Sequence, residues 1–236
     1  MSRKKPAADP LKAHEALEKL LAAFEFRTVL DVGCGPGRHS AILRQAGKEV
    51  TGIDFVKMCD DVIVANYLHH EFNQQFDCLW LSHVVEHQIN VNQFLTKVFR
   101  DLKPGGILAV TVPPLKHNIV GGHVTLWNAG LLLYNLILAG FDCRRARVKH
   151  YGYNISVLVP KVAADVPYDK LHFDRGDIEL VSRFFPEHPR MKWAHSFRGD
   201  IASLNWDGDE LLFDQPRRKS VLRFLSPGYW RAKRAA

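Results

Sequence analysis

The sequence predicts an α/β fold in which helices cover both faces of a mostly parallel sheet. Apolar runs of strand length alternate with segments of helical apolar spacing along residues 10–160, as a parallel sheet requires. The apolar content of 47% in 236 residues is enough for one large core. A glycine-rich turn at residues 33–37 follows the first strand and opens a helix. These three observations carry the prediction.

The elements can be placed in order from the same patterns. A helix is expected to begin at Asp9 and Pro10, because proline suits the first helical turn. The apolar run at residues 28–32 suits a strand that is buried on both faces. A helix follows the glycines, and Lys103 to Gly106 predict a turn after the later helix at residues 91–102. The remaining expectations are strands at residues 49–53, 61–65, 76–82, 107–112, 143–149 and 154–159, and helices at residues 91–102 and 126–139.

The glycines predict a site for a nucleotide-type cofactor. Gly33, Gly35 and Gly37 allow backbone conformations with positive φ and a close approach of a ligand to the next helix N-terminus. Arg38 stands where the dinucleotide fingerprint has its third glycine, so that fingerprint fails. Asp31, two residues before the first glycine, completes a different pattern.

Residues 31–37 resemble the first motif of the class I S-adenosylmethionine (SAM) methyltransferases, and residues 50–54 resemble the second. Residues 76–87 and 102–108 match two later motifs of the family in the same order. The resemblance implies a Rossmann-like sheet of seven strands whose last strand is antiparallel. The short turn at residues 151–153 agrees, because a parallel crossover needs a dozen residues or more.

The resemblance also implies which residues bind SAM. Asp31 and the glycine loop would hold the methionine end, and Asp54 would accept hydrogen bonds from both ribose hydroxyls. Asn66 stands where the family has an acid near the adenine, and its amide can still donate and accept hydrogen bonds. The predicted cofactor-binding residues are Asp31, Gly33, Gly35, Gly37, Asp54, Phe55, Asn66, Tyr67 and Ser82.

An oxygen atom is the favoured methyl acceptor. Family members that methylate amide or ring nitrogens often have an Asn/Asp-Pro-Pro-aromatic motif where this chain has residues 82–85, Ser-His-Val-Val. The expected reaction is O-methylation of a small molecule or of a sugar hydroxyl in a glycan. Two alternatives stay open: methylation of the terminal 2′-hydroxyl of RNA, and a SAM-binding partner protein without catalysis.

Histidines are the candidate catalytic residues, because imidazole transfers protons near neutral pH. His83 and His87 follow the fourth predicted strand, and His123 belongs to the loop expected to fold over the acceptor. Related ubiquinone-pathway and RNA 2′-O-methyltransferases hold a divalent metal with Glu-x-x-Glu-His. Here His83 replaces the first glutamate, so no metal is assigned, and His83, Glu86, His87 and His123 are the candidates if one binds.

Charge and composition limit the classes of partner and the cellular compartment that can be expected. Basic residues in 1–6 and 216–236 more than account for the net charge of +7, so the body is not a basic groove and nucleic acid is an improbable partner. The basic C-terminus could contact a membrane surface. The four cysteines form no C-x-x-C pair, and no apolar run reaches about 18 residues. A cytoplasmic location is therefore expected.

The chain is divided into a methyltransferase domain at residues 1–162 and a C-terminal extension at residues 163–236. The extension is rich in aromatic residues, including Trp193, Trp206 and Trp230, which is unusual for a disordered tail. We expect most of these rings to pack on or beside the core. The alternative is an exposed platform on which a sugar or a base stacks.

Overall fold

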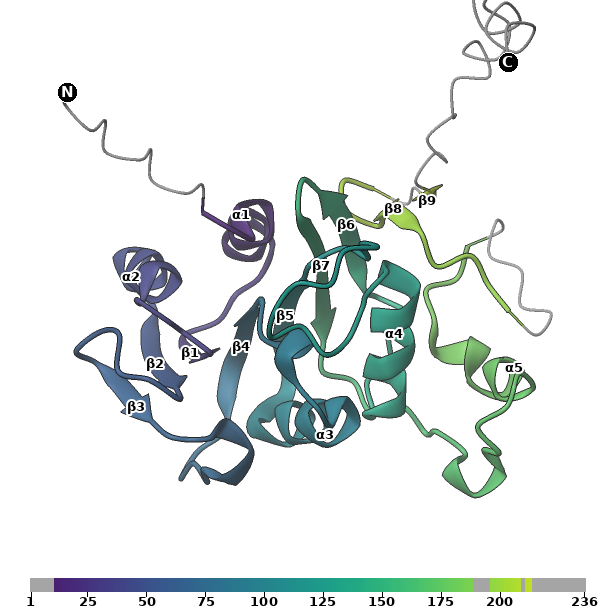
Figure 1. The fold of residues 1–236 in the computed structure, drawn as a ribbon, viewed down its shortest axis with the longest axis horizontal. Helices are drawn as coiled ribbons and strands as arrows, with labels where there is room; N and C mark the ends of the chain where they lie inside the picture. Colours follow the sequence, from purple (N-terminus) through teal and green to yellow (C-terminus); the bar gives the residue numbers. More distant parts are fainter. Residues whose placement is uncertain (1–10, 189–195, 209–210, 214–236) are drawn as a thin grey trace, which may run out of the picture.

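The computed structural model describes residues 11–188, 196–208 and 211–213. Its centre is a nine-stranded sheet in the order β3-β2-β1-β4-β5-β7-β6-β8-β9 (Figure 1). Five parallel strands form one half: β1 (Thr28–Val32), β2 (Glu49–Asp54), β3 (Val62–Val64), β4 (Phe76–Ser82) and β5 (Leu102–Val112). The other half contains β6 (Arg147–Tyr151), β7 (Asn154–Pro160), β8 (Ile201–Leu204) and β9 (Leu211–Phe213).

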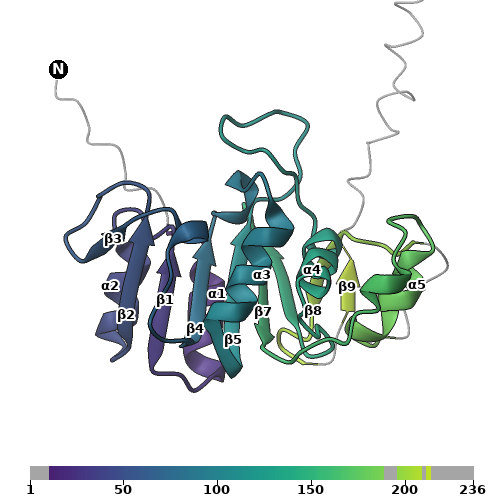
Figure 2. The same ribbon diagram turned by 90° about the horizontal axis from the view of Figure 1, so that it is seen from below.

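The helices lie on both faces of the sheet (Figures 1 and 2). Strand β4 shows why both faces are covered, since its side chains alternate between two apolar cores. Trp80 packs in the core that includes Leu20 and Leu43, whereas Leu81 packs in the core that includes Phe94 and Leu132. The α-helices are α1 (His14–Ala23), α2 (Arg38–Gln45), α3 (Val91–Asp101), α4 (Ala129–Leu138) and α5 (Asp177–Val181), and four 3₁₀ turns lie at Tyr67–His69, Val85–His87, Tyr168–Lys170 and Ser182–Phe184.

The α/β fold with a mostly parallel core is confirmed. Strand β7 runs antiparallel to both β5 and β6, which confirms the predicted reversal of the seventh strand. The sheet does not end there, however. The C-terminal extension adds β8 antiparallel to β6, and β9 antiparallel to β8. The expected count of seven strands was too low because these two strands are short and lie far from the rest in the sequence.

Several boundaries differ from the expected ones; β6, for example, begins at Arg147 and not at residue 143. Asp9 and Pro10 lie outside the described residues, and α1 begins only at His14, after Ala13 adopts a left-handed conformation with φ of 55°. The turn expected after α3 is a bulge within β5. Phe76 pairs with Leu102 but Cys78 pairs with Ile107, so the intervening residues loop out of the ladder.

The extension packs against the core where the structure describes it. Trp206 is 4% exposed and belongs to the apolar core beneath α1, and Asp207 lies 3.2 Å from the Lys19 ammonium of that helix. Trp206 therefore offers no stacking platform to a ligand. Trp193, Trp230 and the basic segments at residues 1–6 and 216–236 lie outside the described residues. Within the described residues, no helix is long and apolar enough to cross a membrane.

Candidate functional site

The glycine loop between β1 and α2 depends on glycine at three positions. Gly33, Gly35 and Gly37 have φ of 69°, 51° and 72°, in the left-handed region that other residues rarely adopt. A Cβ atom on Gly33 would stand 2.4 Å from Cγ2 of Val84. Gly37 is the N-cap residue of α2, so the loop leads directly into a helix N-terminus. The sequence therefore specifies both the turn and its close packing.

Asp54, the last residue of β2, is joined to this loop. Its Oδ2 accepts a hydrogen bond of 2.8 Å from the Gly35 N–H, and its Oδ1 accepts one of 3.1 Å from the Val56 N–H. Two backbone donors thus fix the orientation of the carboxylate. Each carboxylate oxygen can accept more than one hydrogen bond, so acceptor capacity remains for a ligand.

A cavity of about 200 Å³ lies beside Asp54, at the carboxyl ends of β1 and β2. It brings together residues that the sequence predicts for the cofactor and for catalysis. These are Gly33, Asp54, Phe55, Asn66, Tyr67, His83 and His87. The predicted residues Asp31, Gly35, Gly37, Ser82 and His123 do not line this cavity, whereas Val84, Gln88 and Phe94, which the sequence analysis did not single out, do.

Asp31 lies beneath the loop. It is 2% exposed, and its Oδ2 accepts a hydrogen bond of 2.6 Å from the Ser40 hydroxyl of α2. Burial raises the pKa of this carboxyl to about 6, and the hydrogen bond from Ser40 opposes that shift. Asp31 therefore supports the glycine loop from below through Ser40 and does not line the cavity.

Asn66 is another residue that lines the cavity. Its Oδ1 accepts a hydrogen bond of 3.0 Å from the Leu68 N–H and caps the 3₁₀ turn at Tyr67–His69. The side-chain oxygen is therefore engaged within the protein. The Nδ2 amide is the group that Asn66 can offer to a ligand.

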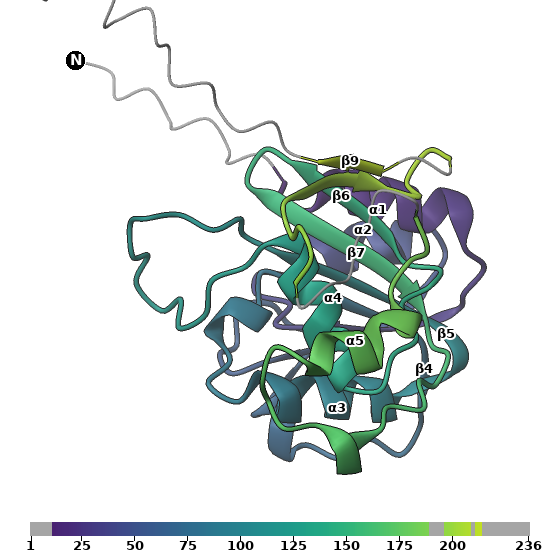
Figure 3. The ribbon, with the colours of Figure 1, turned by 90° about the vertical axis from the view of Figure 1, so that its right-hand side faces the viewer.

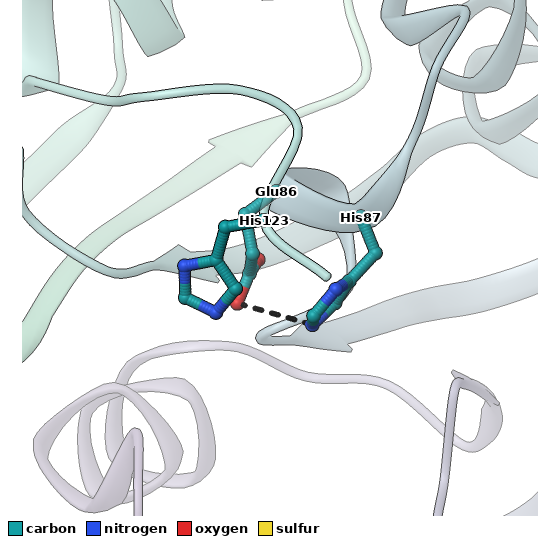
Figure 4. A group of neighbouring side chains, drawn as sticks. All are labelled: Glu86, His87 and His123. Carbon is teal, nitrogen blue, oxygen red and sulfur yellow. Dashed lines mark ion pairs between the residues drawn. The ribbon is translucent and has the colours of Figure 1, made fainter. Parts of the chain in front are cut away.

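Glu86 is the centre of the histidine cluster. Its side chain is 0% exposed, and neither carboxylate oxygen has a hydrogen-bond partner among the described residues. Its Oε1 lies 3.2 Å from Nδ1 of His83 and 3.9 Å from Nε2 of His87. One ligand atom each from Glu86, His87 and His123 lies within 4.8 Å of the others (Figure 4). A buried carboxylate without hydrogen bonds is costly unless a proton or a cation compensates it.

The hydrogen bonds of Asn154 show which ring nitrogen of His83 carries a hydrogen atom. The Ala13 N–H donates to Asn154 Oδ1 at 3.1 Å, so this atom is the side-chain oxygen. His83 Nε2 lies 3.0 Å from the same oxygen and must donate to it. The other ring nitrogen, Nδ1, faces the Glu86 carboxylate and lies 3.2 Å from its Oε1.

His87 has the opposite tautomer when neutral. Its Nδ1 lies 2.7 Å from the carbonyl oxygen of Gly122 and donates a hydrogen bond to it. Its Nε2 then carries a lone pair and points toward Glu86. His87 can therefore accept a proton, or bind a cation, at Nε2.

His123 reaches the cluster from the loop at residues 113–127, which stands out from the body of the protein (Figures 2 and 3). The Val124 N–H donates to the backbone oxygen of Glu86 at 2.9 Å, which ties the loop to the turn at Val85–His87. Burial lowers the pKa of His123, and the positive charges of His87, His83 and Lys12 lower it further, against the opposing effect of Glu86. A neutral His123 near pH 7 suits a base or a metal ligand.

Asn154 is a residue that the sequence analysis missed. It begins an apolar strand after a tight hairpin, and nothing local distinguishes it from an ordinary turn residue. Its role depends on two partners that lie far away in the chain, Ala13 and His83. Only the folded sheet brings these three residues together.

Comparisons with known proteins agree with this geometry. A family model described as "Methyltransferase domain" matches residues 7–153. The malonyl-[acyl-carrier protein] O-methyltransferase of Salmonella typhimurium is 32% identical over 108 residues, which cover 41% of this chain and 43% of that protein. The ubiquinone biosynthesis O-methyltransferase of Rickettsia bellii is 28% identical over 120 residues, or 44% of this chain and 50% of that protein. The chain thus spans about half the length of these curated relatives.

Solved structures share the fold at low sequence identity. The 1,6-didemethyltoxoflavin-N1-methyltransferase of Burkholderia thailandensis superposes with a TM-score of 0.57 at 17% identity, over 65% of this chain and 80% of that chain. A SAM-dependent methyltransferase of Archaeoglobus fulgidus gives a TM-score of 0.55 at 16% identity, over 61% and 91% of the two chains. The architecture is therefore that of these enzymes.

Proposed function

Since the chain belongs to the class I SAM-dependent methyltransferase family, we propose that it transfers the methyl group of SAM to an oxygen atom of an acceptor. One observation carries this proposal. Asp54, hydrogen-bonded to the glycine loop, lines the same cavity as His83 and His87, the two histidines that lie next to Glu86. The relatives named as O-methyltransferases support oxygen as the acceptor atom.

The residues of the cavity fit SAM. Two backbone donors hold the Asp54 carboxylate in place, and its remaining acceptor capacity suits a pair of ribose hydroxyls. Gly33, without a side chain, lets Val84 pack directly against the loop at the wall of the cavity. The Asn66 Nδ2 amide and the Phe55 ring would contact the adenine end. When bound, SAM supplies an electrophilic methyl group on a positively charged sulfur.

We assign proton removal from the acceptor hydroxyl to His87, with His123 beside it. The bond from Nδ1 to the Gly122 carbonyl keeps a lone pair on Nε2, which is the atom that would accept the proton. The Glu86 carboxylate, 3.9 Å away, would stabilise the charged imidazolium that results. His83 has both ring nitrogens engaged, so in this proposal it positions Glu86 and does not act as the base.

A divalent cation is a second candidate at the same place. The buried Glu86 carboxylate, which lacks hydrogen bonds, and the nearby nitrogens of His87 and His123 form a donor set that suits zinc, manganese or iron. Such an ion would supply Lewis-acid activation of the acceptor oxygen.

Elemental analysis of protein purified without chelators would decide between these two forms. A cation site would be supported by two results together. The native protein would contain one equivalent of a metal ion, and chelation would lower the melting temperature of the native protein but not that of His123→Ala. Full activity of ion-free protein would support His87 alone.

The acceptor is proposed at the level of a class. A small molecule or a glycan sugar hydroxyl is the first choice, and the terminal 2′-hydroxyl of RNA is the alternative. RNA binding that weakens steeply with salt would favour the second. A cytoplasmic location and a membrane contact through residues 216–236 stay predictions.

Conversion of SAM to S-adenosylhomocysteine is the direct test of the activity. Purified protein would be incubated with SAM and cell extract or glycan fractions, and mass spectrometry would search for acceptors that gain the mass of one CH₂ group. Methylated products at oxygen would support the proposal. SAM binding without turnover on any fraction would instead indicate a non-catalytic SAM-binding partner protein.

A further inference from the structure

The ammonium groups of two lysines lie near the ring of Tyr153, next to the histidine cluster. The Lys116 ammonium lies 4.0 Å from the ring centroid and the Lys12 ammonium 6.0 Å from it. The same ring is stacked on His83, with 5.9 Å between the ring centroids. Tyr153 thus joins two positive charges to the residues that surround Glu86.

Both lysines come from backbone that the fold holds in place. The carbonyl oxygen of Lys12 accepts a hydrogen bond of 2.9 Å from His39 Nε2, and the next N–H, of Ala13, donates to Asn154. Lys116 follows Leu115, whose N–H donates to the carbonyl oxygen of Trp127 at 2.7 Å. Two segments with a fixed backbone therefore each carry a lysine whose ammonium group lies near the Tyr153 ring.

Lys116 also shares a hollow with His123, one of the candidate catalytic residues. Lys116, His123 and Tyr153 line the same depression beside the projecting loop. An acceptor bound near His123 would lie beside the Lys116 ammonium, with the Lys12 ammonium 6.0 Å from the centre of the adjoining Tyr153 ring.

Carboxylates that could neutralise the lysines are scarce there. Among the described residues, neither Lys12 nor Lys116 has a carboxylate within ion-pair distance. The loop at residues 113–127 contains no aspartate or glutamate, and Glu86 is buried against His83. The hollow therefore has a positive potential, which attracts anions.

We propose that Lys12 and Lys116 bind an anionic oxygen group, a carboxylate or a phosphate, of the methyl acceptor. The ammonium groups act as compact point charges with several donors each, which suits an anion of either kind. Both ammonium groups lie within 6.0 Å of the centre of the Tyr153 ring, and neither is paired with a carboxylate among the described residues. This inference rests on the proposed methyl transfer and narrows its substrates to acidic ones.

The test uses three probes of similar shape on the full chain, with and without S-adenosylhomocysteine. Benzoate carries a carboxylate, phenylphosphonate a phosphate-like group, and benzamide is the neutral match. Calorimetry would compare the native protein with the double variant Lys12→Gln/Lys116→Gln and with the control Lys170→Gln, an exposed lysine in another part of the fold. Thermal melting would verify that each variant is folded.

We expect saturable binding of an anion and none of benzamide, and a loss of affinity of about tenfold or more in the double variant only. The effect should shrink with added salt, because these charges are exposed. Stronger binding of benzoate would point to a carboxylate acceptor, and stronger binding of phenylphosphonate to a phosphorylated one.

Equal binding of benzoate and benzamide, or anion binding that persists in the double variant, would overturn the inference. Lack of anion binding by the native protein would do so as well. Failure of the proposed function is a separate result, since it would appear as lack of binding of S-adenosylhomocysteine in the same calorimeter.

Discussion

The imidazole of His83 and the side-chain oxygen of Asn154 are hydrogen-bonded at 3.0 Å across 71 positions of the chain. The first residue of β7 thereby fixes the ring of a residue that follows β4. Because the same oxygen also accepts the Ala13 N–H, the start of α1 is fixed at this point as well. The buried side-chain amide of Asn154 thus links the start of α1, strand β7 and the Glu86 cluster.

Asn154→Leu should disturb the Glu86 cluster. The change leaves the Ala13 N–H and the His83 Nε2–H without an acceptor, which we expect to lower the free energy of unfolding by about 1–3 kcal/mol. The ¹⁵N shifts of the His83 ring would report the altered tautomer, which a purely structural role would not change. Asn92→Ala, which removes an exposed amide bonded to Leu138, is the matched control. Unchanged ring shifts in Asn154→Leu would contradict the assignment.

Gly33→Ala should abolish tight SAM binding through a clash with Val84. The new Cβ would lie 2.4 Å from Val84 Cγ2, at a φ of 69°. The double variant Gly33→Ala/Val84→Ala removes the clash but keeps the backbone strain of roughly 1–2 kcal/mol, so it should recover part of the affinity. Gly35→Ala meets no atom within 4 Å and should show the strain alone. No recovery in the double variant would refute the clash.

Asp54→Ala should weaken SAM binding by about 1–3 kcal/mol, because hydrogen bonds from the ribose to a charged acceptor are lost. The loop would also lose the bond between Gly35 and the carboxylate. Calorimetry with SAM measures the effect, and Asp60→Ala, an exposed acid in the next loop, is the control. Equal affinities for the two variants would show that Asp54 does not contact the cofactor.

His87→Ala should lower kcat by about 10²–10⁴-fold and leave the affinity for SAM nearly unchanged, because general base catalysis acts on the acceptor. His123→Ala should lower the rate less if His87 is the base, and equally if both bind a cation. A fall in SAM affinity without a fall in rate would show that these histidines serve the cofactor instead. Turnover measured at saturating SAM separates the two effects.

Asp31→Asn should stabilise the protein at neutral and higher pH. Burial raises the pKa of this acid from 3.8 to about 6, so the folded state binds more protons than the unfolded state between those values. Stability therefore falls as the pH rises through that window, by at most about 3 kcal/mol, and then stays lower. Asparagine does not titrate and can still accept the Ser40 hydrogen bond.

Denaturant unfolding at about pH 4 and about pH 8 would measure this effect. We expect the native protein and Asp31→Asn to differ at the higher pH and to converge at the lower one. A constant difference at both values would contradict a buried, titrating Asp31.

Local patterns were sufficient to predict much of the fold. Apolar runs predicted the seven core strands along the chain, and the family resemblance, with which the short turn at residues 151–153 agrees, predicted the antiparallel β7. Glycine spacing predicted a loop whose three φ values are positive. These predictions succeed because the apolar pattern of a strand and the backbone conformation of a turn depend on residues within a few positions. The helix start and the extra strands did not follow from such patterns.

The candidate site depended on contacts that no local pattern contains. The sequence by itself determined the glycine loop, Asp54 and the presence of histidines after β4, since each belongs to one strand end. Only the tertiary structure placed Asp31 beneath the loop, buried Trp206, and brought His123 and Asn154 to the turn that contains Glu86. The physical reason is that the burial of these side chains and their long-range hydrogen bonds form only when the strands assemble into the sheet. The loop at residues 113–127 must also pack onto Glu86.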